Sequence, residues 1–275
     1  MHQKNSIFLF CLLLINICCF AQEKNPNKKP ITIGESVTFQ SKILNQERTL
    51  NIYLPESYSK ETTKKYPVIY LLDGSMDEDF IHIAGLVQFG SFSWINMLPE
   101  SIVVGIANVD RKHDFTYPTK NKKDKEDFPT TGGSSKFIAS IEKEIQPFIT
   151  KNYRTTNTKT LIGQSLGGLL ATEILFKKPA LFDNYIIVSP SLWWDDESLL
   201  KTTPVPFQQE KSIFIAVGKE GPIMERVAKE LYYKLNIEGE KNYTLGFKFL
   251  EAQDHGDALH LAVYAAFEAI FKTKK

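Results

Sequence analysis

The feature that most constrains this chain is a Gly-x-Ser-x-Gly motif at residues 163–167, directly after a short apolar run at residues 160–162. Between a strand and a helix, this motif is typical of a nucleophile elbow, a turn so sharp that side chains at its flanking positions would collide. Residues 169–176 follow with helix-compatible apolar spacing. We therefore predict that Ser165 is the exposed nucleophile of a hydrolase; the alternative is a plain turn rich in glycine and serine.

The first 21 residues have the pattern of a targeting segment. Lys4 supplies positive charge, residues 7–20 are almost wholly apolar, and Ala21 offers a small residue for cleavage. We predict an exported protein, periplasmic or extracellular, with no stable membrane span in its mature chain, because the apolar stretch is short for a span. The alternatives are an uncleaved anchor and lipidation at Cys18 or Cys19. The expected organisation is a signal peptide at residues 1–21, a polar spacer at 22–33 and one domain at 34–275.

Composition excludes several classes of function. The three cysteines all lie in the targeting segment, so the mature chain would contain no disulfide, thiolate metal site or cysteine nucleophile. The chain has 33 Lys and Arg against 32 Asp and Glu, and Lys4 is the one charged residue before residue 22. The mature chain is therefore near neutral and lacks the basic field that drives nucleic-acid binding. We expect no nucleic-acid partner, no metal and no organic cofactor, and the sequence leaves the oligomeric state open.

Short continuous apolar runs alternate with segments of helical spacing through most of the chain. Runs without polar alternation suit strands buried on both faces, as in a parallel sheet. Their alternation with helices predicts an α/β-hydrolase fold: a mostly parallel sheet, helices on both faces and an N-terminal antiparallel hairpin. The expected hairpin strands are residues 36–44 and 48–54, the later strands 66–72, 102–106, 160–162, 185–188, 213–217 and 243–250, and the helices 137–148, 169–176, 224–235 and 259–271.

Two irregular segments are expected between these elements. Pro147 should kink or end the helix at residues 137–148, because proline lacks a backbone donor. Residues 114–133 have turn chemistry and little periodicity, and they are expected to form a loop that overhangs the site.

A serine hydroxyl needs a base to become a nucleophile, and histidine is the usual one. In α/β-hydrolases the chain order is serine, acid, histidine, with the histidine after the last strand. Only His255 and His260 come late enough. His255 lies in a polar turn after the last expected strand, whereas His260 lies between leucines in an expected helix. We predict His255 as the base, with His260 as the alternative.

The acid that orients this base should follow the strand at residues 213–217, which favours Glu220. Asp195 and Asp196 follow the preceding strand and are the main rivals, and Glu225 is a weaker one because it begins an expected helix. A Ser-His dyad without an acid is the remaining alternative.

The oxyanion that forms during acyl transfer needs two backbone N–H donors. One should be the N–H of Leu166, the residue after the nucleophile. The other should come from the loop after an earlier strand, and Gly74 or Ser75 is placed there, with the glycine allowing close backbone approach.

Several segments together resemble the Putative esterase family of the α/β-hydrolase superfamily, which includes enterochelin-esterase-like and S-formylglutathione-hydrolase-like enzymes. The matching segments are residues 66–74, 103–106, 110–116, 163–168, 189–194 and 254–256. The resemblance implies a serine esterase in which Ser165 and His255 carry catalysis. It also implies that Asp110, Arg111 and Asp114 shape the region near the site and that Trp193 and Trp194 help to form its wall. Some relatives manage without a well-placed acid.

The expected function is an exported serine carboxylester hydrolase that works through an acyl-enzyme on Ser165. Siderophore esters and acylated-glycan or phenolic esters are the expected substrates. Arg111 is a candidate for holding an anionic substrate, or it pairs with Asp110 or Asp114. Trp193 and Trp194 offer aromatic surface for phenolic groups, or they pack in the core. The alternatives are an acyltransferase of the same fold and a non-catalytic binding protein.

Overall fold

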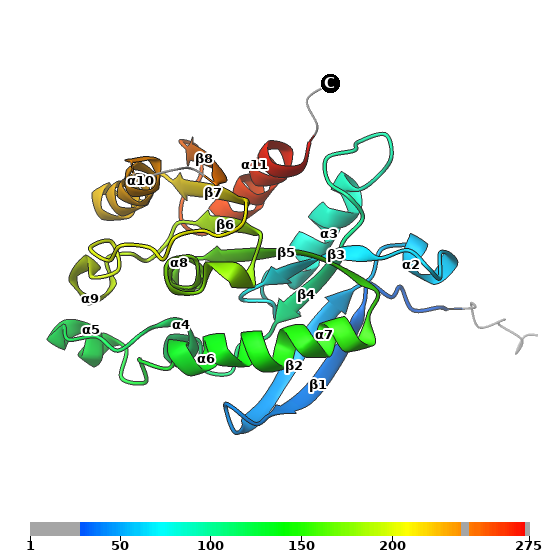
Figure 1. Cartoon of the computed structure of the whole chain (residues 1–275), viewed down its shortest axis with the longest axis horizontal. Helices are drawn as coiled ribbons and strands as arrows, with labels where there is room; N and C mark the ends of the chain where they lie inside the picture. The colour runs from blue at the N-terminus through cyan, green and yellow to red at the C-terminus, as the bar shows by residue number, and fades with distance from the viewer. Residues whose placement is uncertain (1–27, 238–241, 273–275) are drawn as a thin grey trace, which may run out of the picture. The chain divides into compact units, whose positions relative to one another are not determined.

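One mixed sheet organises the chain (Figure 1). Within residues 28–237 and 242–272, which the computed structural model describes, eight strands lie in the order β1-β2-β4-β3-β5-β6-β7-β8. β1 pairs antiparallel with β2, β2 pairs antiparallel with β4, and the strands from β4 to β8 are parallel. The strands are β1 (Glu35–Ser41), β2 (Gln46–Tyr53), β3 (Tyr66–Leu71), β4 (Ile102–Ile106), β5 (Thr155–Gln164), β6 (Asn184–Val188), β7 (Lys211–Gly218) and β8 (Tyr243–Leu250).

The helices cover both faces of this sheet. α3 and α11 pack on one face, and α6, α7, α8 and α10 pack on the other (Figure 1). The longer helices are α3 (Phe80–Gly90), α6 (Ser134–Ser140), α7 (Gln146–Asn152), α8 (Leu166–Lys177), α10 (Pro222–Ile237) and α11 (Ala258–Phe271). The shorter ones are α2 (Ser57–Lys60), α4 (Arg111–Phe115), α5 (Lys122–Asp127), α9 (Trp194–Glu197), the π-helical turn η1 (Ile141–Ile145) and the 3-10 turn η2 (Pro179–Leu181).

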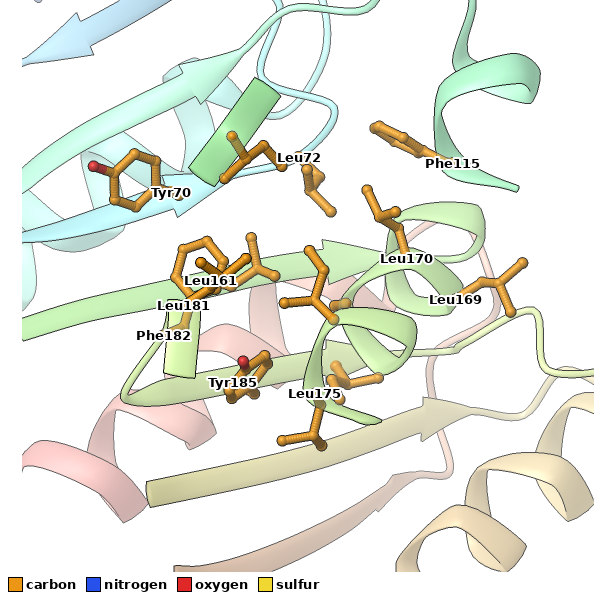
Figure 2. Packing of buried hydrophobic residues seen from close by; sticks show 14 of the residues in the cluster. Tyr70, Leu72, Phe115, Leu161, Leu169, Leu170, Leu175, Leu181, Phe182 and Tyr185 are labelled. Carbon is orange, nitrogen blue, oxygen red and sulfur yellow. The ribbon is translucent and has the colours of Figure 1, made fainter. Parts of the chain in front are cut away.

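The core explains why the central strands carry unbroken apolar runs. Leu161 of β5, Tyr70 of β3 and Tyr185 of β6 point to the same face, where they meet the apolar side of α8 (Figure 2). Every residue of β4 and β6 is buried, because helices cover both faces of the sheet there. The predicted α/β-hydrolase fold, with its hairpin and mostly parallel sheet, is therefore confirmed.

Two local expectations need correction. The chain stays helical past Pro147, because η1 directly precedes α7 and places the proline in the first turn of α7, where its missing donor costs no hydrogen bond. Residues 114–133 are not wholly irregular, since they contain α5, capped by the Asn121 side chain through the backbone N–H groups of Lys123 and Asp124.

The predicted signal peptide and the first half of the predicted spacer, residues 22–27, lie outside the described residues. All the elements above belong to one compact unit, Ile33–Lys275. Among the described residues, no helix is both long enough and apolar enough to cross a bilayer.

Candidate active site

Ser165 occupies a strained turn between β5 and α8. Its φ of 58° and ψ of −120° are unusual for a residue with a side chain. The turn closes only because its neighbours are glycines: a Cβ on Gly163 would lie 2.4 Å from the carbonyl oxygen of Gly167. A Cβ on Gly168 would lie 2.9 Å from the Cα of Pro190, on the loop after β6. The motif therefore forms the tight strand-to-helix turn that its spacing predicts.

His255 and Glu220 form a hydrogen-bonded pair. His255 Nδ1 lies 2.5 Å from Glu220 Oε2, and the glutamate side chain is only 2% exposed. An ionised carboxylate can only accept hydrogen bonds, so Nδ1 carries the proton and Nε2 keeps a free lone pair. This is the tautomer that a general base requires.

Three donors converge on the Glu220 carboxylate. Besides His255, the hydroxyl of Ser189 and the backbone N–H of Gly218, at 2.8 Å, both donate to Oε1. Burial acts to raise the pKa of Glu220, but these hydrogen bonds outweigh burial and hold the pKa below its ordinary value. The carboxylate is thereby kept charged at neutral pH.

Two hydrogen bonds bring the loops of this pair to the elbow. The side-chain amide of Gln164 donates to the carbonyl of His255 at 2.6 Å, which attaches the histidine loop to the residue before Ser165. The N–H of Lys219 donates to the carbonyl of Gln253 at 2.7 Å, which joins the acid loop to the histidine loop. Gly218 allows this approach, since a Cβ there would lie 2.6 Å from the same carbonyl. The structure thus pairs His255 with Glu220 and attaches their loops to the residue before Ser165.

The candidate oxyanion donors do not all remain available. Leu166 begins α8, so its N–H has no partner within the helix. The N–H of Gly74 donates to the carbonyl of Ile106 at 3.0 Å, which removes Gly74 from the candidate donors. Its role is close approach, since a Cβ there would lie 2.3 Å from the Cα of Gly105. The N–H of Ser75 makes only a long contact, 3.4 Å, with Glu78 Oε2.

Arg111 binds Asp73 and not the acids proposed from the sequence. Its Nε and Nη2 donate to the two carboxylate oxygens of Asp73 at 2.6 and 2.9 Å, and Nη2 also reaches the carbonyl of Gln164 at 3.3 Å. Asp110 instead caps α4, and Asp114 forms a buried ion pair with Arg48 at 2.7 Å. The predicted pairing of Arg111 with Asp110 or Asp114 is therefore wrong. The guanidinium connects the elbow to the loop of Asp73 and Ser75 after β3, the candidate oxyanion loop.

The two tryptophans differ in their surroundings. Trp194 is fully buried, and its indole N–H donates to the carbonyl of Tyr117 at 3.0 Å. It cannot form part of a substrate-binding wall, so that prediction is wrong for Trp194. Trp193 is half-buried and packs against Phe128, with 6.0 Å between ring centroids.

The rival acids have other partners. Asp195 accepts hydrogen bonds from the Thr119 hydroxyl at 2.9 Å and the Lys120 N–H at 2.6 Å, and Asp196 accepts from the Asn121 amide at 2.7 Å. Both aspartates therefore fix the segment that leads into α5. The other rival has a local partner as well: Glu225 accepts a bond from the Gly221 N–H at 3.2 Å at the start of α10.

The alternative base, His260, lies on α11 and stacks on His82 of α3, with 3.6 Å between ring centroids. Burial, followed by the nearby His82, lowers the pKa of His260. The ring belongs to the contact between these two helices.

Sequence reasoning missed three residues of this arrangement. Ser189 supports Glu220, and Ser191 Oγ lies 3.3 Å from Ser165 Oγ. Asp73 holds Arg111 from a left-handed turn with a φ of 56°. A usable signal existed for Asp73, which is a charged residue at the end of a buried strand and directly before a glycine.

Comparison with known proteins places the chain among esterases. A family model described as Putative esterase matches residues 41–256. The ferri-bacillibactin esterase BesA of Bacillus subtilis is 29% identical over 245 residues, which cover 81% of this chain and 84% of the relative.

Solved structures agree with the fold. An IroE-like serine hydrolase from Shewanella oneidensis is similar with a TM-score of 0.77 and 30% identity, over 87% of this chain and 80% of the other. The BES protein from Bacillus cereus has the same TM-score with 27% identity, over 92% of this chain and all of the other.

Proposed function

This chain belongs to the Putative esterase family and is a carboxylic ester hydrolase, and from that premise we propose that it works through an acyl-enzyme on Ser165. One observation carries the proposal: the buried, charged Glu220 holds His255 in the base tautomer, on a loop hydrogen-bonded to the residue before Ser165. This arrangement supplies a nucleophile, a base and an orienting acid.

In the proposed reaction, the Ser165 hydroxyl attacks the ester carbonyl while His255 Nε2 takes its proton. Negative charge then develops on the former carbonyl oxygen, and the N–H groups of Leu166 and Ser75 stabilise it. The imidazolium, stabilised by Glu220, donates its proton to the departing alcohol. A water molecule, deprotonated by the same histidine, then cleaves the acyl-enzyme and releases the acid.

For the substrate, we propose an ester bond of a siderophore. Several relatives carry such an activity in their names. They include the ferri-bacillibactin esterase above and a siderophore enterobactin esterase of Emericella nidulans, which is 40% identical over 72 residues, 25% of this chain and 24% of the relative. Half-buried Trp193 and Phe128 offer aromatic surface that suits catechol rings.

The test is hydrolysis of enterobactin and bacillibactin, with and without iron, followed by chromatography beside a p-nitrophenyl ester series. We expect Ser165→Ala to lower kcat/KM by about 10⁴-fold or more, with Ser59→Ala on exposed α2 as the matched control. Full activity of Ser165→Ala would refute the acyl-enzyme. Turnover of the p-nitrophenyl esters without turnover of either siderophore would refute the substrate alone.

Export is a further part of the proposal. Its support is the charged, then apolar, then small-residue pattern of residues 1–21. Fractionation of expressing bacterial cells and N-terminal sequencing of the product test it. A mature chain that begins near residue 22, outside the cytoplasm, is the expected result, and a cytoplasmic chain that keeps Lys4 would contradict it.

A further inference from the structure

Aromatic side chains gather at the end of α3 and in the loop that follows it. Trp94 is 75% exposed, and one face of its indole stacks on Phe92, with 4.6 Å between ring centroids and 19° between ring planes. Phe89 supports Phe92 edge-on, at 6.2 Å and 74°. A large aromatic side chain gains free energy when it is covered, so a tryptophan displayed in this way favours a ligand that covers its open face.

The loop that displays Trp94 is held in place by its own backbone. The carbonyl of Phe92 accepts hydrogen bonds from the N–H groups of Ile95 and Asn96 at 2.9 and 2.7 Å. The next residues, Met97 and Leu98, are buried at 2% and 4% exposure and anchor the loop in the core. The aromatic surface is therefore preorganised, which lowers the entropic cost of binding.

A polar cleft adjoins this surface. Its volume is about 400 Å³, within the range of small-molecule sites, and Trp94 and Phe92 form one wall. The other walls carry groups that accept or donate hydrogen bonds, among them Glu56, Glu61, Gln88 and Glu100. An aromatic face beside several hydrogen-bonding side chains matches the two faces of a sugar ring, which presents C–H groups to the indole and hydroxyls to the cleft.

The charges in the cleft select among possible ligands. Glu56 pairs with Lys60, while Glu100 and Glu61 lie 2.6 and 3.6 Å from the ammonium of Lys64. Because each of these carboxylates already faces a resident lysine, an incoming cation gains little. The three glutamates outnumber the two lysines, so the net charge is negative and disfavours an anion. Each carboxylate still has lone pairs free to accept from hydroxyl groups, which favours a neutral, hydroxyl-rich ligand.

We propose that Trp94 and this cleft form a binding site for a neutral saccharide, separate from the catalytic site. The cleft contains Ser57 of α2 and Glu100, which precede β3 and β4, so it lies where those strands begin. Ser165 follows the end of β5, which runs parallel to β3. The two sites therefore lie at opposite ends of the parallel strands, so a glycan bound at one site leaves the other accessible.

Calorimetric titration of the full chain with cellohexaose, xylohexaose, mannohexaose and maltohexaose tests the proposal. We expect at least one of them to bind, with a shift in tryptophan emission. Trp94→Ala should weaken that binding about tenfold or more, while Trp94→Tyr, which keeps an aromatic face, should bind within a few-fold of the wild type. Tyr233→Ala, on α10, is the matched control because Tyr233 is also an exposed aromatic residue, at 57%, and it should bind as the wild type does.

Three results would overturn the proposal. One is the absence of binding by all four saccharides at about 10 mM, a concentration that would reveal a Kd of about 1 mM. Another is equal binding by Trp94→Ala and the wild type. The last is Trp94-dependent binding of tetramethylammonium in place of any saccharide, which would assign the site to a cation. Far-UV circular dichroism of each variant checks that it is folded.

Discussion

Two groups of carboxylates are linked to the elbow through Gln164, and their electrostatic surroundings shift carboxyl pKa values in opposite directions. On one side, the Gln164 amide binds the carbonyl of His255, whose ring binds Glu220. On the other side, the Gln164 carbonyl accepts from Arg111, which binds Asp73 at the oxyanion loop. Gln164, directly before Ser165, therefore joins the side of His255 and Glu220, the acid-base side of the proposed reaction, to the side of Arg111 and Asp73, its oxyanion side.

The two sides differ in how closely carboxylates crowd together. Glu220 stands alone with three donors, and its pKa lies below the ordinary value although burial opposes this. On the oxyanion side, Asp73 accepts from Arg111 and Asn108, Glu78 accepts from Asn108, and both carboxylates lie near Asp79. There, burial first, then the charges of Asp73 and Glu78, raise the pKa of Asp79 to about 6, against the smaller opposing effect of Arg111.

This difference follows from what each side must do in the proposed reaction. The acid must stay charged to stabilise the imidazolium, so the fold surrounds it with donors. The oxyanion loop must instead hold a backbone N–H in a fixed place, and Asp73 does this through a left-handed turn and a bidentate arginine. Crowded negative charge is the electrostatic cost of that turn.

The largest effect is expected from removing the charge on the acid-base side. Glu220→Gln keeps the shape, but its amide can donate and favours the wrong tautomer of His255, so kcat/KM should fall roughly 10²- to 10⁴-fold. Hydrolysis of p-nitrophenyl acetate measures this, and Glu225→Gln, in the first turn of α10, is the control. Activity of Glu220→Gln close to that of the wild type would show that a Ser-His dyad suffices.

A smaller effect is expected from removing the cation on the oxyanion side. Arg111→Met leaves Asp73 and its acidic neighbours without their shared partner, so the free energy of unfolding should fall by about 2 kcal/mol, a value reduced because the Arg111 side chain is 33% exposed. The displaced turn should also lower kcat about tenfold or more. Urea unfolding and steady-state kinetics measure the two effects.

Arg111→Lys separates charge from geometry, because lysine keeps the charge but not the two parallel bonds. We expect it to recover part of the stability and less of the kcat. Unchanged stability and kcat in Arg111→Met, with a rise in KM alone, would instead support the substrate-binding role predicted from the sequence.

Ser189→Ala tests whether the Glu220 carboxylate needs all three of its donors to stay charged and to orient His255. Removing one of three should lower kcat/KM about three- to tenfold and the free energy of unfolding by about 1 kcal/mol at pH 7. A carboxylate whose pKa is lowered in the folded state contributes stability above its ordinary value of 4.5 and loses it as the pH falls through the folded value. The loss should therefore fade in acid, and an equal loss at all pH values would contradict this account. Ser134→Ala, also buried, is the matched control.

The fold was predictable because its signals are local. The unbroken apolar run at β4 matched the strand to the residue, since strands buried on both faces must be apolar throughout. The arrangement of Ser165, Glu220 and His255 was also within reach, because chain order and the carboxyl ends of parallel strands bring those positions to one edge of the sheet.

What the sequence did not reveal depends on tertiary contacts. Nothing in the order of residues distinguishes Asp73 from Asp110 or Asp114 as the partner of Arg111, and the nearest aspartates in the sequence proved to have other partners. Trp193 and Trp194 are likewise identical neighbours in sequence. Both rings pack against Phe128, but only Trp194 is fully buried, with its indole N–H on the carbonyl of Tyr117.

The smallest effect is expected from removing the charge of Asp79, one of the crowded carboxylates on the oxyanion side. Because Asp79 has a raised pKa in the folded state, the folded protein binds its proton more tightly than the unfolded chain does. The free energy of unfolding therefore falls as the pH rises from 3.8 to about 6, and the penalty remains above that range. Asp79→Asn cannot ionise, so it should be more stable than the wild type by about 1 kcal/mol at pH 7 and equal to it near pH 3.5.

The exposed neighbour Asp77 provides the control for this change, since Asp77→Asn alters the local net charge by the same amount without relieving a half-buried group. Urea unfolding of both variants across pH 3.5 to 8 separates the two contributions. If Asp79→Asn is the less stable protein at pH 7, then attraction to Arg111 outweighs burial and repulsion. The oxyanion side would then resemble the Glu220 side, with each carboxylate adequately paired, and the contrast between the two sides would be lost.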